Sequence, residues 1–246
     1  MLAARQRLAY PRVMARIDLV LFDCDGVLVD SELISMRCLV DALGRVGHQI
    51  DAESAQARFL GVSTASMCAM LEEERGEPLP DSFLDDLRRS LFNAFAAELV
   101  PVDGITRLID RLAVTRCVAS SSTPERIRHS LRVTGLIGRL EPHIFSATMV
   151  ARGKPAPDLF LHAARSMGVA PENCLVIEDS VAGVTAARTA GMIAIGFTGG
   201  SHLTHAVHGP ALTEAGAAFV CPSSGVLELR LAQLGVIGPR SGRAAG

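Results

Sequence analysis

The chain has 246 residues, 49% of them hydrophobic, and its 24 basic and 26 acidic side chains give a net charge of −2 (24 − 26). This balance argues against a nucleic-acid-binding protein, and the longest uncharged apolar stretch, near residues 192–200, is too short to cross a membrane. The length suits one α/β domain, or a core domain that carries an insertion.

The chain starts with an arginine-rich segment, residues 1–16, that has no acidic residue and lacks the apolar run of a secretory signal. We expect a frayed N-terminal extension, or translation that begins at Met14, with a short organellar targeting peptide as an alternative. The six cysteines form no C-x-x-C pair. Such isolated thiols fit a reducing cytoplasm and argue against zinc ribbons and disulfide frameworks.

The first predicted strand, Ile17–Phe22, is nearly all apolar and is expected to be buried in a parallel sheet. Asp23 and Asp25 follow it directly, with Cys24 between them. Because strand side chains alternate with a period of two, the two carboxylates point the same way and Cys24 points into the packed interior. Two buried like charges need a divalent cation or a phosphate-binding group nearby, unless both aspartates are simple turn residues.

Residues 31–101 contain no predicted strand. Apolar residues at helical spacing predict three helices in this stretch, Glu32–Val46, Ser63–Glu74 and Asp81–Leu99. We expect a helical cap domain that is inserted after the first strand and closed by Pro101-Val102-Asp103-Gly104. Because such a cap lies above the site, its closure would exclude water and contact the remote end of a substrate.

Strands and helices alternate in the rest of the chain. Short apolar runs predict strands at Thr115–Ala119, His143–Ser146, Cys174–Glu178, Met192–Gly196 and Ala217–Val220, of which His143–Ser146 is the weakest. Helices are predicted at Thr123–Thr134, Pro157–Met167, Val181–Ala190 and Ser223–Leu234. The alternation predicts an α/β fold with a doubly wound, Rossmann-like parallel sheet. The expected domains are an N-terminal extension (1–16), a core (17–30 and 102–238), the cap (31–101) and a flexible tail (239–246).

Polar residues follow the predicted strands, at the edge where parallel sheets bind ligands. The segments are Asp23-Cys24-Asp25, Ser120-Ser121-Ser122, Gly153-Lys154-Pro155-Ala156-Pro157-Asp158 and Glu178-Asp179-Ser180-Val181-Ala182-Gly183. In order and spacing they resemble the signature of the haloacid dehalogenase-like superfamily, and most closely that of its β-phosphoglucomutase-like and sugar-phosphate phosphatase members. The resemblance runs from Ile17 to about Phe197.

The resemblance implies a role for each matching residue. Asp23 would be the nucleophile that attacks phosphorus and forms an aspartyl-phosphate. Asp25 would protonate the leaving sugar oxygen and then take a proton from the attacking water. Ser120 would donate to a phosphoryl oxygen, and Lys154 would neutralise charge that develops there. The alternatives are a serine that only caps a helix and an exposed loop lysine.

The same resemblance implies a Mg²⁺ cofactor. Its ligands would be Asp23, the main-chain carbonyl of Asp25, and Asp179, with Glu178 either bound directly or supporting those ligands. Hard oxygen donors of this kind suit Mg²⁺.

Three histidines near the end of the chain, His202, His205 and His208, also suggest a metal site. On a helix, residues three apart drift around the axis, so the three side chains would not share one face. We therefore expect solvated histidines, or histidines that support other ligands.

Two departures from the mutase pattern favour hydrolysis. β-Phosphoglucomutases of this family carry an arginine after Gly-Val-Ser and a basic residue after the serines of the second strand. Here Thr64 follows Gly61-Val62-Ser63, and Thr123 follows Ser120-Ser121-Ser122. Both changes weaken the clamp that a bisphosphate intermediate needs. We expect a phosphatase for a small phosphorylated metabolite, such as a sugar phosphate resembling 6-phosphogluconate, with a sugar phosphomutase as the alternative.

Other classes of protein fit less well. A dehalogenase would lack an acid at the position of Asp25, and a non-catalytic relative would usually have lost one of Asp23, Asp25, Lys154 or Asp179. We expect a cytoplasmic enzyme, monomeric or weakly homo-oligomeric, that binds a small phosphorylated metabolite and neither nucleic acid nor membranes.

Overall fold

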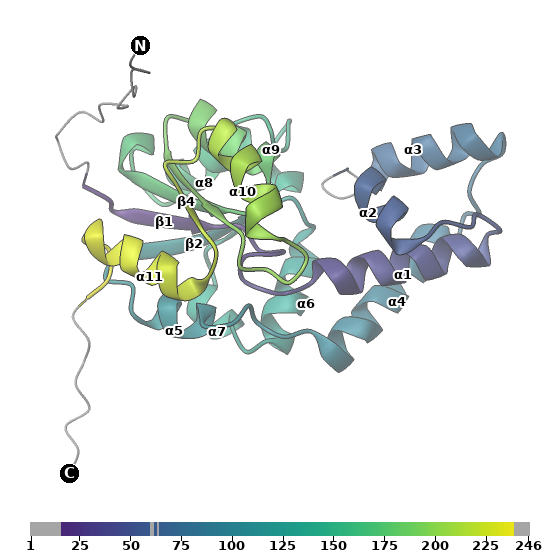
Figure 1. Ribbon diagram of the computed structural model, residues 1–246, viewed down its shortest axis with the longest axis horizontal. Coiled ribbons are helices and arrows are strands. Elements are labelled where there is room, and N and C mark those ends of the chain that lie inside the picture. The colour runs from purple at the N-terminus through teal and green to yellow at the C-terminus, as the bar shows by residue number, and fades with distance from the viewer. Residues whose placement is uncertain (1–15, 60–61, 63, 239–246) are drawn as a thin grey trace, which may run out of the picture.

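The computed structural model in Figure 1 describes residues 16–59, 62 and 64–238. The predicted extension, except for Arg16, and the predicted tail lie outside these residues, as do Gly61 and Ser63. The described chain consists of a sheet flanked by helices and a helical projection, which extends to the right in Figure 1.

A six-stranded parallel sheet forms the centre of the fold. Its strands are β1 (Leu19–Phe22), β2 (Thr115–Ser120), β3 (Ile144–Ser146), β4 (Cys174–Glu178), β5 (Ile193–Phe197) and β6 (Phe219–Cys221). The strand order is β3-β2-β1-β4-β5-β6, with every neighbouring pair parallel. This doubly wound order confirms the predicted Rossmann-like sheet, including β3, its weakest predicted strand.

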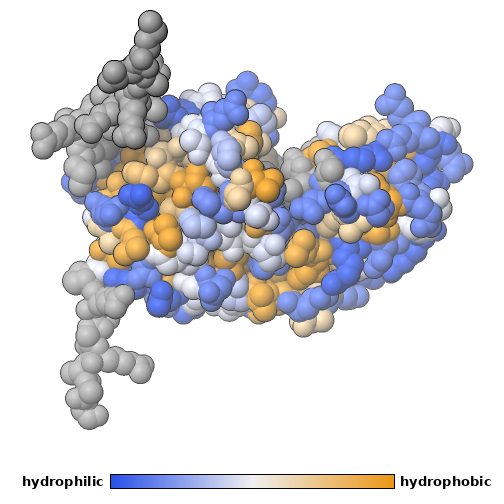
Figure 2. All heavy atoms as spheres, viewed as in Figure 1, coloured by the Kyte–Doolittle hydropathy of each residue, from blue (hydrophilic) through white to orange (hydrophobic). Residues whose placement is uncertain are grey.

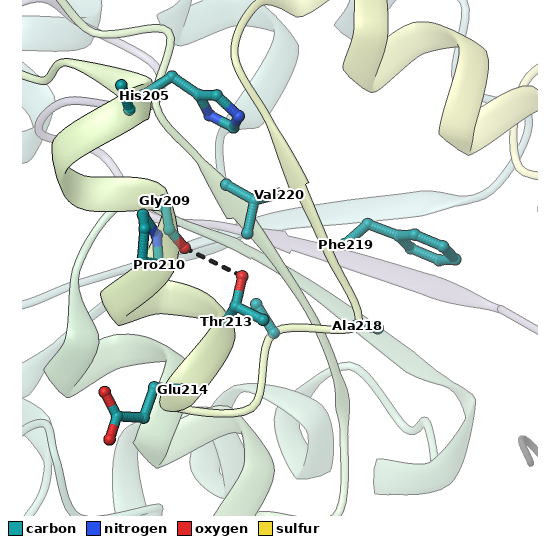
Figure 3. A pocket seen from close by; sticks show the side chains of 10 residues that line it. His205, Gly209, Pro210, Thr213, Glu214, Ala218, Phe219 and Val220 are labelled. Carbon is teal, nitrogen blue, oxygen red and sulfur yellow. Dashed lines mark hydrogen bonds between the residues drawn. The ribbon is translucent and has the colours of Figure 1, made fainter. Parts of the chain in front are cut away.

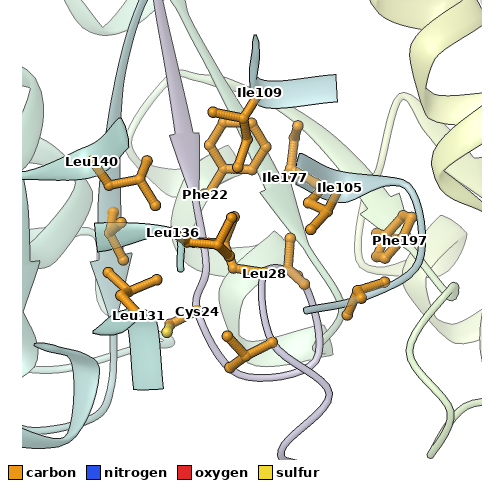
Figure 4. Close-up of a cluster of buried hydrophobic side chains, with 14 of the residues drawn as sticks. Phe22, Cys24, Leu28, Ile105, Ile109, Leu131, Leu136, Leu140, Ile177 and Phe197 are labelled. Carbon is orange, nitrogen blue, oxygen red and sulfur yellow. The ribbon is translucent and has the colours of Figure 1, made fainter. Parts of the chain in front are cut away.

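Alternate residues of the central strand face opposite sides of the sheet. In β1, Val20 and Phe22 belong to one hydrophobic cluster, whereas Leu19 and Leu21 belong to another. Both sets are fully buried, because helices cover both faces of a parallel sheet and its strands are therefore apolar throughout. Cys24 lies in the first cluster (Figure 4) and is 1% exposed, which confirms that this thiol packs in the interior.

Helices cover the two faces of the sheet. On the first face lie α5 (Ile105–Asp110), α6 (Pro124–Val133) and α11 (Ser224–Gln233). On the second face lie α8 (Asp158–Ser166), α9 (Val181–Thr189) and α10 (His205–Glu214). The short α7 (Ile137–Leu140) follows α6, and 3-10 turns form at Ala147–Met149 and Pro171–Asn173. The predicted ends of α6, α8, α9 and α11 are each within one residue of these bounds. The sequence did not predict α10, because Pro210 interrupts its helical pattern.

Four helices between β1 and β2 form the projection, which we call the cap. They are α1 (Glu32–Arg45), α2 (Ala52–Phe59), α3 (Thr64–Arg75) and α4 (Phe83–Glu98). They enclose a hydrophobic cluster of their own, which includes Leu43, Leu71 and Phe83. The sequence did not predict α2, because its eight residues carry too few apolar side chains to form a clear helical pattern.

The outer helices α1 and α4 join the cap to the core. Ile34 of α1 and Phe95 of α4 belong to the same hydrophobic cluster as the core strands. The two connecting segments are also tied together, since the backbone N–H of Asp30 donates to the carbonyl of Val100 (3.0 Å). Helices α1–α4 therefore have the arrangement of a cap inserted between β1 and β2.

The face of the molecule in Figure 2 has hydrophilic residues over most of the far end of the cap and scattered apolar residues over the core. Within the described ranges, none of the helices is both long enough and apolar enough to span a bilayer.

Candidate active site

The carboxyl edge of the sheet gathers the side chains that the sequence singled out. Phe22, the last residue of β1, is paired with Val118 of β2 and with Ile177 of β4. The residues that follow these three positions therefore emerge side by side, and the cap rises from the same edge.

Asp23, Glu178 and Asp179 form a compact group that we call the acidic cluster. One carboxylate oxygen of each residue lies within 4.8 Å of the others. Among the described residues, these three form the one cluster of His, Cys, Asp or Glu side chains that could hold a metal ion. Burial raises the pKa of Asp23 well above its usual value, and the charges of Glu178 and Asp179 add to that effect. Burial also raises the pKa of Asp179. The cluster therefore requires compensating positive charge.

Lys154 supplies part of that charge. Its Nζ donates to Asp23 Oδ1 (2.7 Å) and to Glu178 Oε1, and its side chain is 4% exposed. Burial alone would lower the pKa of Lys154, but the charges of Asp23 and Glu178 outweigh burial and raise it, so the ammonium group stays charged. Lys154 is therefore not the exposed loop lysine of the alternative interpretation.

Glu178 is fully buried, and protein groups contact both of its carboxylate oxygens. Lys154 donates to Oε1, while the backbone N–H (3.2 Å) and the hydroxyl (2.9 Å) of Ser180 donate to Oε2. Gly183 leaves the space for this carboxylate, because a Cβ at that position would overlap its atoms. The orientation of Glu178 is thus set by the protein itself.

Asp25 lies in a separate set of hydrogen bonds. Its Oδ1 accepts from Ser31 Oγ (2.6 Å) and Arg126 Nη2 (2.9 Å), and its Oδ2 accepts from Ser122 Oγ (2.7 Å). Burial alone would raise the pKa of Asp25, but the Arg126 charge and these hydrogen bonds outweigh burial and lower it. The two aspartates thus have opposite electrostatic environments, although one residue separates them.

The sequence did not predict Ser31, Ser122 or Arg126 as partners of Asp25. The hydroxyl of Ser122 is not used to cap the following helix, because Thr123 caps α6: its Oγ1 accepts from the backbone N–H of Arg126 (3.3 Å). Arg126 belongs to none of the motif segments. The feature of the sequence that could have indicated its role is its position about one helical turn after the serine run 120–122.

Ser120 is buried at the end of β2, where the structure places it at the carboxyl edge of the sheet. Its Oγ accepts a hydrogen bond from the backbone N–H of Ser122 (3.1 Å). Because Thr123 caps α6, Ser120 is not the helix cap of the alternative interpretation.

The three histidines do not form a metal site with one another. His202 is buried, and its Nε2 lies 3.1 Å from Asp179 Oδ2. His205 Nδ1 contacts Thr198 Oγ1 (2.9 Å), and His208 Nδ1 contacts the backbone of Thr204. This arrangement agrees with the expectation, since His205 is exposed to solvent and His202 contacts Asp179, one of the expected metal ligands.

A pocket lies between α10 and β6 (Figure 3). Its lining includes His205, Thr213 and Val220, and Thr213 Oγ1 donates to the carbonyl of Gly209 (3.0 Å). The pocket lining includes His205 but no residue of the four motif segments, so the carboxyl edge of β1 is the better candidate for the active site.

The acidic cluster fits a divalent cation such as Mg²⁺. Three carboxylates face one lysine, which leaves an excess of negative charge inside the protein, and hard oxygen donors are the ligands that Mg²⁺ prefers. Asp23 and Asp179 could bind it directly, together with the carbonyl of Asp25, and Glu178 is held beside them.

Comparisons with known proteins agree with the fold and identify the family. The model of the haloacid dehalogenase-like hydrolase family matches residues 17–191. The 6-phosphogluconate phosphatase of Escherichia coli (strain K12) is 33% identical over 196 residues, which cover 79% of this chain and 89% of that protein.

Among the similar solved structures are two that match most of the chain. A haloacid dehalogenase-like protein of unknown function from Agrobacterium tumefaciens is 38% identical, with a TM-score of 0.76, and the match covers 89% of this chain and 99% of that one. A hydrolase of the same family from Deinococcus radiodurans R1, solved with bound phosphate and sodium, is 34% identical, with a TM-score of 0.75, and the match covers 92% and 99%. Together with the family match, these likenesses confirm the resemblance seen in the sequence: the chain belongs to the haloacid dehalogenase-like hydrolase family.

Proposed function

We propose that this protein is a Mg²⁺-dependent phosphatase that hydrolyses a small phosphorylated metabolite through an aspartyl-phosphate on Asp23. The observation that carries the proposal is the contact between Lys154 and Asp23, a member of the acidic cluster. A carboxylate at a strand end, a buried ammonium group and surplus carboxylates are the groups that phosphoryl transfer to an aspartate requires. The named activity of the Escherichia coli relative and the phosphate bound to the Deinococcus relative support the same chemistry.

Asp23 would act as the nucleophile. One of its oxygens would form the bond to phosphorus while the leaving oxygen departs with the bonding electron pair. Water would then attack phosphorus, release inorganic phosphate and restore the carboxylate of Asp23. Asp23, Asp179, the Asp25 carbonyl and Glu178 would hold the Mg²⁺, which would supply positive charge to offset the charge of the phosphoryl group.

Asp25 would transfer the proton in both half-reactions. It would protonate the leaving oxygen in the first step and accept a proton from the attacking water in the second. Ser31, Ser122 and Arg126 fix the position of its carboxylate before substrate binds. Arg126 favours the ionised form of Asp25, so the approach of the substrate must weaken this pairing before Asp25 can act as an acid.

Lys154 and Ser120 would bind the phosphoryl group. The charge of Lys154 opposes the rise in the pKa of Asp23 that burial causes, and Lys154 would offset the negative charge that develops on the phosphoryl oxygens. Ser120, at the end of β2, would donate a hydrogen bond from its hydroxyl group to one of those oxygens.

A sugar phosphate is the substrate class that we favour, and 6-phosphogluconate is the first compound to test because of the Escherichia coli relative. A phosphomutase would need a second cationic clamp. Thr123 takes the place of a basic residue and caps α6, whereas Gly61 and Ser63 lie outside the described residues. We further propose that the cap (31–101) closes over the core (17–30 and 102–238) during turnover and that the enzyme is a cytoplasmic monomer or weak homo-oligomer.

A screen of phosphorylated metabolites tests the proposal. The purified chain is incubated with each compound, with and without Mg²⁺, and released phosphate is measured. We expect Mg²⁺-dependent release from at least one sugar phosphate. A folded protein that releases no phosphate from any compound with Mg²⁺ supplied would contradict the proposal.

A further inference from the structure

We propose that His202 is a positioning residue that holds the carboxylate of Asp179 in the orientation needed to bind the divalent cation. The inference rests on the proposed metal site, but it concerns a residue outside the four motif segments. Its basis is a direct contact, a space formed by two glycines, and a fixed loop.

The contact joins His202 to the acidic cluster. The Nε2 of His202 lies 3.1 Å from Oδ2 of Asp179, and the histidine side chain is 3% exposed. A carboxylate oxygen can only accept, so Nε2 must carry the hydrogen. The protein therefore directs Oδ2 of Asp179, whereas the described residues make no hydrogen bond to Oδ1.

Two glycines form the space that admits the imidazole ring. A Cβ on Gly26, which has a φ of +76°, would lie 2.7 Å from His202 Cε1 and would also overlap Asp179 Oδ2. A Cβ on Gly200 would lie 2.9 Å from the ring and 2.8 Å from the carbonyl of Gly26. These distances are too short for carbon atoms, so both glycines are required for His202 and Asp179 to lie together.

The loop that carries His202 is fixed to the connection between core and cap. Oδ1 of Asp30 accepts from both the backbone N–H (3.0 Å) and the hydroxyl (2.9 Å) of Ser201. From the cap, Gln56 Nε2 makes a longer contact of 3.4 Å with the carbonyl of His202. These contacts hold the backbone that carries the ring, which a positioning role requires.

Nothing else in the described residues explains why a histidine is buried here. Its Nδ1 is buried and has no hydrogen-bond partner within the described part of the chain, so Asp179 is the one protein group that its ring satisfies. Residues that orient metal-binding carboxylates typically change metal affinity 10- to 100-fold when they are removed. We expect His202 to act on cation affinity in this range.

A matched pair of variants tests the role of the donor. His202→Met and His202→Gln introduce side chains of nearly the same shape, but only glutamine can donate to Asp179. Mg²⁺ affinity is measured by calorimetric titration of the metal-stripped full-length protein, and the Mg²⁺-induced rise in melting temperature provides a second readout. His205→Ala is the control, because His205 is exposed and contacts Thr198 rather than the acidic cluster.

We expect His202→Met to weaken Mg²⁺ binding by about 10- to 100-fold, and His202→Gln and His205→Ala to stay within a few-fold of the unmodified protein. Equal Mg²⁺ affinity in the methionine variant and the unmodified protein would overturn this inference alone. An unmodified protein that binds no Mg²⁺ would overturn the proposed metal site together with the inference. Circular dichroism melts verify that each variant is folded.

Discussion

Arg126 and Asp25 are 101 residues apart in the chain, yet Nη2 of Arg126 lies 2.9 Å from Oδ1 of Asp25. The same Nη2 lies 3.1 Å from Ser35 Oγ on α1, and the guanidinium group lies over the ring of Phe95 on α4, 5.5 Å from its centroid. One core side chain therefore contacts both helices that join the cap to the core, as well as the proposed acid/base. A change in cap position would alter the surroundings of Asp25 through Arg126.

Replacement of Arg126 should affect turnover and stability together. Arg126→Gln leaves the buried Asp25 without its counter-ion, so we expect a loss of about 2–4 kcal/mol in the free energy of unfolding. We also expect kcat to fall more than tenfold on a sugar phosphate, because the orientation of Asp25 is lost. Urea melts and steady-state kinetics measure the two effects. Arg132→Gln, on the exposed side of the same helix, is the matched control and should change neither quantity.

Removal of the proposed nucleophile should abolish turnover and leave the fold intact. Asp23→Asn keeps the shape of the side chain but cannot form the aspartyl-phosphate, so phosphate release should fall at least roughly a thousandfold. Phosphate release with Mg²⁺ and a thermal melt provide the two measurements. Substantial Mg²⁺-dependent activity in this variant would exclude Asp23 as the nucleophile.

The role of Asp25 can be tested with two substrates whose leaving groups differ in their need for a proton. Asp25→Ala should slow the hydrolysis of a sugar phosphate by about 10²–10⁴-fold, because an alkoxide leaving group needs a proton. The same variant should slow p-nitrophenyl phosphate far less, because nitrophenolate leaves without protonation. Equal slowing of the two substrates would argue against proton transfer by Asp25.

Glu32, at the start of α1, should make stability depend on pH. Burial, followed by the charge of Asp25, raises its pKa from 4.5 to about 7. Below pH 4.5 the ionisation of Glu32 does not affect the free energy of unfolding. Between pH 4.5 and 7 it lowers this free energy increasingly, and above pH 7 the loss stays constant. Glu32→Gln removes this cost, so the variant should gain roughly 1–3 kcal/mol relative to the unmodified protein as the pH rises from 4.5 to 8. Urea melts without divalent cations, at several pH values, measure the difference, and parallel pH profiles for the two proteins would contradict it.

Hydrolysis should be faster than phosphate migration within a sugar. Thr123 caps α6 where the mutases of the family carry a basic residue, so a bisphosphate intermediate would lack one clamp. With glucose 1-phosphate as substrate, phosphate release should exceed the formation of glucose 6-phosphate, as followed by a coupled dehydrogenase assay. Faster isomerisation than release would favour the mutase.

Much of the fold could be predicted from local pattern. Strands such as β4 are short apolar runs bounded by polar residues, and helices such as α6 have clear apolar periodicity and a threonine cap. Four helices were not predicted. α5 and α7 have only six and four residues, too few to show a helical period. α2 has too few apolar residues to show a pattern, whereas α10 contains Pro210 and is stabilised by packing on β5 and β6.

The sequence by itself determined which residues emerge at the carboxyl edge of the sheet, because a strand delivers its following residues there whatever surrounds it. Asp23, Asp25, Ser120 and Glu178 could thus be assigned to one edge before any contact was known. Only the tertiary structure decided what each carboxylate contacts. The partners Arg126 and His202 come from distant parts of the chain, and their pairings depend on side-chain reach and on space left by glycines, which no local pattern records.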